Sequence, residues 1–521
     1  MKTLSAFFSL TRAGWVLARE GVISALPAEA LPGPARVGHS LAGLIARRQS
    51  RDRKQSERLS LALNRLGPSW VKLGQFLATR PDVVGAATAK DLALLHDQMK
   101  SFSAKEAREI IEASIGRPVD EVYSEFSDAV AAASMAQVHK AKLASTGDEV
   151  AVKVIRPGVR KRFTKDLETF FAAARLQEKY IAEAQRLKPV AVVEMLAQSA
   201  KIEMDLRLEA AAFSELAENT MDDVGFSVPT VNWEFTGRDC ITMDWVDGTK
   251  LNDVQGLRSA GHDLEALSVT LIQSFLRHTL RDGFFHADMH PGNLFVDATG
   301  DIVAVDLGIA GRLEKKERRF LAEILLGFIT RDYIRVAQVH FDAGYVPPHH
   351  DVKSFAQAIR AIGEPIHGQP AETISMAKLL TLLFEVTEIF DMQTRPELLL
   401  LQKTMVVVEG VARTLDPKFD MWSASEPVVR DWITKNLGPV GMMEDAKDGL
   451  IAARRLVHLL PEMAERAESL SLDMEALIKN GMQLDAATTE AIGKAEARNN
   501  RWGHLGIWAI AALGAYWVFF S

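Results

Sequence analysis

The sequence predicts an α+β protein in which a short strand-rich segment lies between two long helical parts. Three observations lead to this prediction. Alternating apolar residues are concentrated between residues 127 and 155, helical periodicity fills most of the rest, and two short apolar runs flank a turn at 297–301. With 521 residues, 48% of them hydrophobic and 25% charged, the chain has the composition and length of roughly three globular domains. Disordered, collagenous and disulfide-rich classes are therefore excluded.

Charge and cysteine content narrow the functional classes further. The formal net charge of -7 argues against general nucleic-acid binding, so we expect no nucleic acid as a partner. Cys240 is the only cysteine in the sequence, which excludes an intrachain disulfide and fits a reducing compartment.

Residues 1–58 are predicted to form an amphipathic and basic helical segment. Met1–Glu20 mixes aromatic and aliphatic residues with two arginines, and Arg12 interrupts any signal-like core, which favours an amphipathic helix over a cleaved signal peptide. Packing on the body of the protein is the alternative. A basic cluster follows, made of Arg47, Arg48, Arg51, Arg53, Lys54 and Arg58. It suits anionic membrane lipid, at about 1 kcal/mol per basic residue near the surface, although a solvated helix face gives the same pattern.

The C-terminal residues 502–521 are predicted to form a transmembrane helix. They contain no charged residue and would be about 30 Å long as a helix, which matches a bilayer core. Lys494, Arg498 and Arg501 precede this stretch and would keep the body of the protein cytoplasmic. We therefore expect a single-pass C-terminal anchor, with a buried terminal helix as the alternative.

The central part of the chain divides into three predicted regions. Residues 59–125 read as a helical extension, 126–247 as strands followed by helices, and 248–495 as mostly helical. The expected strands are Ala129–Ala131, Gln137–Leu143, Glu149–Ile155 and Cys240–Met243. The second and third of these flank a Ser-Thr-Gly-Asp turn and predict a β-hairpin.

Four polar side chains occur in an order that suits phosphoryl transfer. Lys153 lies within an alternating strand, Asp288 and Asn293 are five positions apart, and Asp306 opens an Asp-Leu-Gly turn. A lysine on a strand would reach the α- and β-phosphate oxygens of a nucleotide triphosphate. Asn293 and Asp306 offer the oxygen ligands that Mg2+ accepts, and Asp288 would orient or deprotonate an attacking hydroxyl or water.

A buried lysine needs a carboxylate partner, and two glutamates compete for that role. Glu203 and Glu209 are both expected on one helix, where residues six apart point in directions about 120° different. Only one of them is therefore expected to face Lys153.

Together these motifs resemble the protein-kinase-like superfamily, and within it the UbiB family of atypical kinases. The segment 286–293 matches His-x-Asp-x-x-x-x-Asn, and residues 306–308 stand where Asp-Phe-Gly is usual. Three further motifs are specific to the family: Lys-x-Gly-Gln at Lys72, Gly74 and Gln75, Glu-x-Asp at Glu203 and Asp205, and the alanine-rich loop Ala131, Ala132, Ala133 and Ser134. The resemblance covers residues 60–415, roughly.

The resemblance implies a protein-kinase-like bilobal fold with an N-terminal helical extension, an N-lobe at 126–247 and a C-lobe from 248. It implies ATP or ADP and Mg2+ as cofactors, with Glu209 as the partner of Lys153. Glu203 and Asp205 would then face the Lys-x-Gly-Gln segment as part of a regulatory motif, while the reverse assignment of the two glutamates stays open. Met243 and Trp245 resemble a hinge that meets adenine through backbone groups, or else simply end a strand.

Two departures from ordinary kinases have physical consequences. Each alanine of the 131–134 loop adds a β-carbon that limits the approach of the backbone to phosphates, so nucleotide should be held differently. A helix is expected only a few residues after Gly308, which leaves no room for a long activation segment. In the family, the Lys-x-Gly-Gln segment also occupies the place of a protein substrate. We therefore expect poor phosphorylation of proteins in trans.

By resemblance, the expected function is a membrane-anchored kinase or ATPase that supports ubiquinone biosynthesis at the bacterial inner membrane. Its expected partners are polyprenyl-phenol quinone intermediates, anionic lipid and other ubiquinone-biosynthesis enzymes. Two alternatives remain open, namely a lipid or small-molecule kinase and a non-catalytic nucleotide-binding scaffold.

Overall fold

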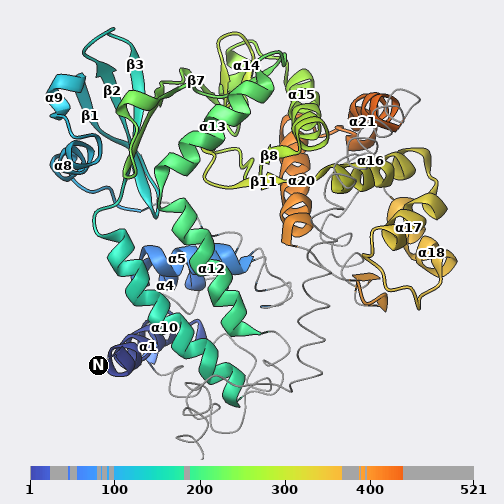
Figure 1. The fold of residues 1–521 in the computed structure, drawn as a ribbon, viewed down its shortest axis with the longest axis horizontal. Helices are drawn as coiled ribbons and strands as arrows, with labels where there is room; N and C mark the ends of the chain where they lie inside the picture. Colours follow the sequence, from blue (N-terminus) through green and yellow to red (C-terminus); the bar gives the residue numbers. More distant parts are fainter. Residues whose placement is uncertain are drawn as a thin grey trace, which may run out of the picture. The chain divides into compact units, whose positions relative to one another are not determined.

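The computed structural model describes most of the first 437 residues (Figure 1). The described residues are 2–23, 45–46, 55–78, 84, 88, 91–92, 95, 99–180, 188–365, 386–387, 389–392 and 396–437. One compact unit spans Met1–Thr434, and a second unit spans Lys435–Ser521. The predicted anchor at 502–521 and most of the basic cluster lie outside the described residues. Among the helices that are described, none combines the length and apolarity needed to cross a membrane.

A five-stranded antiparallel sheet forms the core of the predicted strand-rich region, and its edge strand β5 was not predicted. Its strands are ordered β1-β2-β3-β6-β5 and span Tyr123–Ala132, Ala136–Leu143, Glu149–Ile155, Cys240–Asp244 and Val231–Asn232 respectively. The predicted hairpin is confirmed as β2 and β3, which pair in antiparallel register across the 144–148 turn. Strand β1 begins three residues before the expected domain start at 126.

One face of this sheet is covered by two helices that precede it. Helix α8 (Ala104–Ile115) begins at a Ser103–Glu106 capping box and ends at Gly116, whose φ of 73° is in the left-handed region. Together with α9 (Val119–Val122) it packs on the valines of β3 in a core whose members are at most 6% exposed. Because alternate strand residues point to opposite faces, burying Val152 and Val154 against these helices sends Lys153 to the other face.

A group of helices on the N-terminal side surrounds α5 (Pro68–Ala78). Helix α5 contacts α4 (Gln55–Leu66), α10 (Val159–Tyr180) and α12 (Pro189–Glu203), and Trp70 meets Phe170 edge to face at 4.8 Å. The predicted N-terminal helix is confirmed as α1 (Lys2–Arg19), and it contacts α4 and α10. It therefore packs on the body of the protein, while Phe8 and Trp15 remain 65% and 52% exposed.

The C-terminal region is mostly helical and contains two small sheets. Strands β4 (Phe226–Ser227), β10 (Ile302–Ala304), β9 (Leu294–Asp297) and β7 (Gly248–Lys250) form one, and β8 (Phe284–His286) pairs with β11 (Ala310–Arg312) in the other. Gly248 opens β7. The helices of this region are α14 (Val254–Ser259), α15 (Leu264–Arg277), α16 (Lys315–Thr330), α17 (Tyr333–Asp342), α18 (Val352–Gly363), α20 (Pro396–Leu415) and α21 (Met421–Leu437), whereas α13 (Leu206–Thr220) contacts β5 and β6 of the five-stranded sheet.

Candidate active site

Lys153 lies at the centre of the candidate site because β3 is the middle strand of the five-stranded sheet. Its neighbours across the sheet are Val138 on β2 and Ile241 on β6. The Nζ atom lies 2.6 Å from Glu209 Oε1 and 3.1 Å from Asp306 Oδ2. The structure thus joins three residues that are separated by up to 153 positions in the sequence.

The three groups place one ammonium between two carboxylates. Burial acts to lower the pKa of Lys153, but the charges of Asp306 and Glu209 outweigh it and raise that pKa. Burial acts to raise the pKa of Asp306, yet Lys153 and the N–H of Gly308 keep it below its ordinary value. The pKa of Glu209 is raised, chiefly by burial and then by Asp306, because Lys153 compensates only in part.

This cluster has the properties expected of a divalent-cation site. With both carboxylates ionised it carries a net charge of -1, since a single ammonium faces two acids. Glu209 is 6% exposed, whereas the side chain of Asp306 is 41% exposed. The accessible carboxylate of Asp306 can therefore take a further positive charge, and hard oxygen donors suit Mg2+.

The pairing of the two glutamates follows from a boundary between two helices, which was not predicted from the sequence. We expected Glu203 and Glu209 on one helix, and this is wrong. Helix α12 ends at Glu203, and α13 begins at Leu206 with Asp205 as its N-cap. Glu209 lies in the first turn of α13 and pairs with Lys153, whereas Glu203 pairs with Lys72 on α5. The favoured pairing is confirmed, and the reverse one is excluded.

The Lys-x-Gly-Gln segment lies on α5, against the end of α12. The Lys72 side chain is 7% exposed and forms its ion pair with Glu203, which is 21% exposed. A β-carbon on Gly74 would lie 2.5 Å from a methyl of Leu95 and 2.7 Å from one of Leu63, so only glycine fits without displacing both leucines. Gln75 follows on the same helix.

Asp205 has a different environment from the one expected. Its carboxylate accepts the backbone N–H of Arg207 and pairs with the Arg207 guanidinium at 2.7 Å. The Arg207 hydrogen bond is the main reason that the pKa of Asp205 is lowered. The hydrogen bonds of Asp205 therefore serve the N-terminus of α13 and do not reach the Lys-x-Gly-Gln segment.

The loop between β8 and β9 brings Asp288 and Asn293 together. The Asn293 side-chain amide donates to the Asp288 carbonyl oxygen at 3.2 Å and lies 3.5 Å from Asp288 Oδ2. The loop is anchored to the Asp-Leu-Gly turn, because the N–H of Ala287 donates to Ile309 O and the N–H of Val305 donates to Asn293 O. Both candidate metal ligands, Asn293 and Asp306, are thus held by one hydrogen-bonded unit.

His286 is buried beside this loop and accepts the backbone N–H of Asp288 at its Nδ1, 3.4 Å away. Burial lowers the pKa of His286 despite the nearby acids Asp288 and Asp306. A neutral imidazole that accepts a loop N–H can orient the loop without acting as a base.

The alanine-rich loop lies where β1 turns into β2. Ala131 and Ala132 end β1, and the N–H of Ala133 donates to Ala136 O, while Ser134 is 1% exposed. The Arg156 guanidinium donates to the carbonyl oxygens of Ala133 at 2.8 Å and Lys100 at 3.0 Å. Arg156 follows directly after β3, so it ties the loop to the strand that carries Lys153.

The expected hinge residues lie at the end of β6. Met243 is 3% exposed and pairs with Ala151 on one side and Val231 on the other. The N–H of Trp245 donates to Glu149 O at 3.2 Å, and the Trp245 ring lies 4.8 Å from the Lys140 ammonium. Their adenine contact remains a prediction.

Two functional candidates on α20 were not anticipated from the sequence. Lys403 Nζ lies 3.6 Å from Asp288 Oδ1, and the buried Thr404 hydroxyl lies 2.9 Å from the Ala287 carbonyl oxygen. Both therefore contact the loop that carries Asp288. The only local signal is the polar run Gln-Lys-Thr between two apolar stretches of the helix, which by itself indicates no partner.

The expected shortness of the segment after Asp-Leu-Gly is confirmed. Strand β11 follows Gly308 after one residue, and α16 begins at Lys315. Six residues thus separate Gly308 from the next helix, so this part of the chain cannot form a long peptide-docking platform.

Two family models and several known proteins match this chain. The ABC1 atypical kinase-like domain matches residues 94–340, and the UbiB helical domain matches residues 359–420. The chain is 37% identical to the probable protein kinase UbiB of Marinobacter nauticus over 97% of this chain and 92% of that protein. It is 39% identical to its counterpart in Aliivibrio fischeri over 74% and 72%. A solved structure titled as the Rv3197–erythromycin complex from Mycobacterium tuberculosis is 21% identical, covers 76% of this chain and 98% of that one, and has a TM-score of 0.46.

Proposed function

This chain belongs to the UbiB family of atypical kinases, and we propose that it binds Mg2+–ATP and hydrolyses it at the Lys153 site. Its fold is the kinase-like bilobal α+β fold, and family membership implies a role in ubiquinone biosynthesis. The proposed coupling is between hydrolysis and the handling of polyprenyl-phenol intermediates at a membrane.

The observation that carries this proposal is the sharing of Lys153 between Glu209 and Asp306. A purely structural lysine needs one carboxylate, and Glu209 already supplies it at 2.6 Å. The second carboxylate, on Asp306, is accessible and belongs to the Asp-Leu-Gly turn. An excess acid at the edge of a buried ion pair is suited to a cation that arrives with a ligand.

Each residue then has a defined role. Lys153 would bind phosphate oxygens, and Glu209 would hold the lysine extended from β3. Asn293 and Asp306 would hold Mg2+, which when bound neutralises charge on the phosphates. Asp288 would orient the attacking hydroxyl or water and accept its proton. Lys403, beside Asp288, would supply a second cation where charge develops on the transferred phosphoryl group.

Membrane attachment is the second part of the proposal. Phe8 and Trp15, seven residues apart on α1, are exposed on a helix that otherwise packs on the protein, and large exposed aromatics suit a lipid interface. We propose the cytoplasmic side of the bacterial inner membrane as the location, with anionic lipid and polyprenyl-phenols as partners. Phosphorylation of proteins in trans should be poor.

The proposal is tested by ATP hydrolysis with purified full-length protein, with and without anionic liposomes. Asp288→Asn should lower the turnover number about 10²- to 10⁴-fold, because a general base is lost. The exposed Asp222→Asn is the matched control and should leave the rate unchanged. Equal rates for wild type and Asp288→Asn would contradict the proposal.

Radiolabelled ATP and quinone profiling distinguish the proposal from its alternatives. Label from the γ-phosphate should appear as free phosphate, whereas label in an extracted lipid would indicate a lipid kinase. A deletion strain that expresses Asp288→Asn should lack ubiquinone. Full rescue by that variant would indicate a non-catalytic scaffold.

A further inference from the structure

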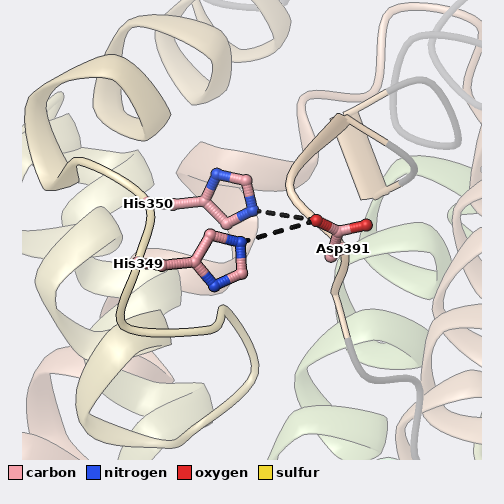
Figure 2. A group of neighbouring side chains, drawn as sticks. All are labelled: His349, His350 and Asp391. Carbon is pink, nitrogen blue, oxygen red and sulfur yellow. Dashed lines mark hydrogen bonds and ion pairs between the residues drawn. The ribbon is translucent and has the colours of Figure 1, made fainter.

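Two adjacent histidines and an aspartate converge at the surface of the helical region, away from the nucleotide-site residues in sequence (Figure 2). Nε2 of His350 lies 3.2 Å from Asp391 Oδ2, and Nε2 of His349 lies 3.7 Å from the same oxygen. The three ligand atoms all lie within 4.8 Å of one another. Nothing in the proposed function uses these residues.

The spacing of these atoms is that of ligands around one small cation. Ligand atoms bonded at ~2.0–2.1 Å to a tetrahedral zinc lie about 3.3 Å apart. The separations of the two ring nitrogens from Asp391 Oδ2, 3.2 and 3.7 Å, bracket this value. The imidazole rings lie with their centroids 4.2 Å apart and direct the same ring nitrogen toward the carboxylate. A metal ion placed between these atoms would accept the lone pairs of both ring nitrogens together with one carboxylate oxygen.

The backbone around the cluster is built to hold it. The histidines follow two consecutive prolines, and the N–H of His350 donates to Pro347 O at 3.2 Å. Proline fixes φ, so the turn loses little freedom on binding. The next residue, Asp351, caps α18 through the N–H of Ser354. The histidine pair is therefore fixed between a rigid turn and a helix start.

The aspartate is held just as firmly from the other side. Asp391 has a φ of 48°, in the left-handed region that few residue types other than glycine, asparagine and aspartate adopt. The preceding residue, Phe390, is 7% exposed, belongs to the core around α17 and α18, and lies 5.3 Å from the His350 ring. The carboxylate therefore stands on a backbone that is anchored in the protein interior.

We propose that His349, His350 and Asp391 form a binding site for one divalent transition-metal ion of the zinc type. Two imidazoles and one carboxylate are three protein ligands, which leaves a fourth position for water. Imidazole donors favour Zn2+, Co2+ or Ni2+ over Mg2+, so the site would take a different ion from the all-oxygen site at Asp306. The metal would link the turn before α18 to the segment that precedes α20.

The first test is a Co2+ titration monitored by visible absorption. The full-length protein is purified without a polyhistidine tag and stripped of metal beforehand. Wild type should bind one equivalent with the intense d–d bands of tetrahedral coordination. His349→Ala and Asp391→Asn should each lower the affinity at least tenfold, because each removes one of three ligands. Asparagine tolerates the left-handed backbone, so Asp391→Asn changes the ligand without straining the chain.

Matched controls decide where the ion binds. His262→Ala removes a histidine of the turn before α15 and should leave the titration unchanged. Asp306→Asn should also retain the cobalt bands, since it alters only the oxygen-rich site. Loss of the bands in Asp306→Asn, or unchanged affinity in Asp391→Asn, would overturn the proposal.

Thermal unfolding gives an independent readout. ZnCl2 should raise the melting temperature of wild type and of His262→Ala, because an ion that binds only the folded state stabilises it. It should have little effect on His349→Ala. The metal-free melting temperatures report whether each variant folds, and His349 is 66% exposed, so its loss should leave them unchanged. An equal zinc response in wild type and His349→Ala would refute the site.

Discussion

Two lysine–glutamate pairs lie on either side of the junction between α12 and α13, and they differ in what surrounds them. Lys153 pairs with Glu209 in the first turn of α13, and Lys72 pairs with Glu203 at the end of α12. Both lysines are about nine-tenths buried. Lys153 also contacts a second, accessible carboxylate, whereas the contact described for Lys72 is with Glu203 alone.

The second carboxylate near Lys153 marks a binding site, whereas the Lys72–Glu203 pair is a structural ion pair. An ion pair with a spare acid has an unbalanced charge that a ligand can complete, so its strength depends on what binds. A lysine with one acid is already neutralised and mainly fixes two helices relative to each other. Because only Met204 and Asp205 separate α12 from α13, movement of α5 would be passed to Glu209, and hence to Lys153.

The largest effect should come from removing the lysine with two partners. Lys153→Met keeps most of the side chain's length but removes its charge, which leaves Glu209 and Asp306 facing each other and any phosphate. We expect ATP turnover to fall about 10³-fold, in line with the loss of a preorganised electrostatic group. Lys72→Met should cost less than about tenfold, because it removes no group proposed to touch nucleotide. Steady-state hydrolysis and nucleotide-analogue binding measure both. Similar losses in the two variants would erase the distinction.

The Lys72–Glu203 ion pair should instead affect the free energy of unfolding, and loss of the glutamate should cost more than loss of the lysine. Glu203→Gln leaves the Lys72 ammonium without a carboxylate at 7% exposure, and we expect about 2–3 kcal/mol of destabilisation. Lys72→Met leaves Glu203, which at 21% exposure can still be hydrated, and should cost less than about 1 kcal/mol. Urea unfolding at pH 7 compares the two. A Lys72→Met protein as unstable as Glu203→Gln would mean that the acid, not the lysine, is the buried partner.

The sequence predicted the Lys153–Glu209 pair better than it predicted the boundaries of the helices around that pair. Local patterns sufficed for the β2–β3 hairpin, because Gly147 has a φ of 80° and valines alternate along β3. Residue order and spacing sufficed for Lys153, Asp288 and Asp306, since phosphoryl transfer requires those types in that sequence. The break at Met204 was missed because apolar periodicity continues through it, although Asp205 is a typical N-cap residue.

Contacts made by distant segments could not be read from the sequence. Lys403 lies 115 positions after Asp288, and the mostly apolar sequence of α20 around it indicates only a buried helix. Likewise, Asp391 meets His349 only because the core around Phe390 and Phe355 brings the two segments together. Tertiary packing, not local propensity, decides such contacts.

An intermediate effect is expected from Lys403, which extends the comparison to a third lysine. It lies 3.6 Å from Asp288 and is 35% exposed, so it is neither buried nor shared like Lys153. Lys403→Met should lower turnover about tenfold with little change in stability, since an exposed pair contributes little to folding. Lys418→Met, on the loop after α20, is the control. If Lys403→Met changed the unfolding midpoint and not the rate, the lysine would act only in packing.

The smallest effect on stability is expected from the buried His286, which contacts the active-site loop through the Asp288 N–H. Burial holds its pKa below the ordinary value, so the unfolded state takes up a proton before the folded state does. The stability that neutral His286 provides is therefore present above about pH 6.5 and is lost as the pH falls below it. His286→Asn keeps an acceptor for the Asp288 N–H but cannot titrate. Between pH 7 and 5, wild type should lose about 1 kcal/mol more unfolding free energy than this variant. Parallel stability curves for the two proteins would show that His286 can be protonated in place, and the loop would then be oriented by its backbone bonds to Ile309 and Val305 alone.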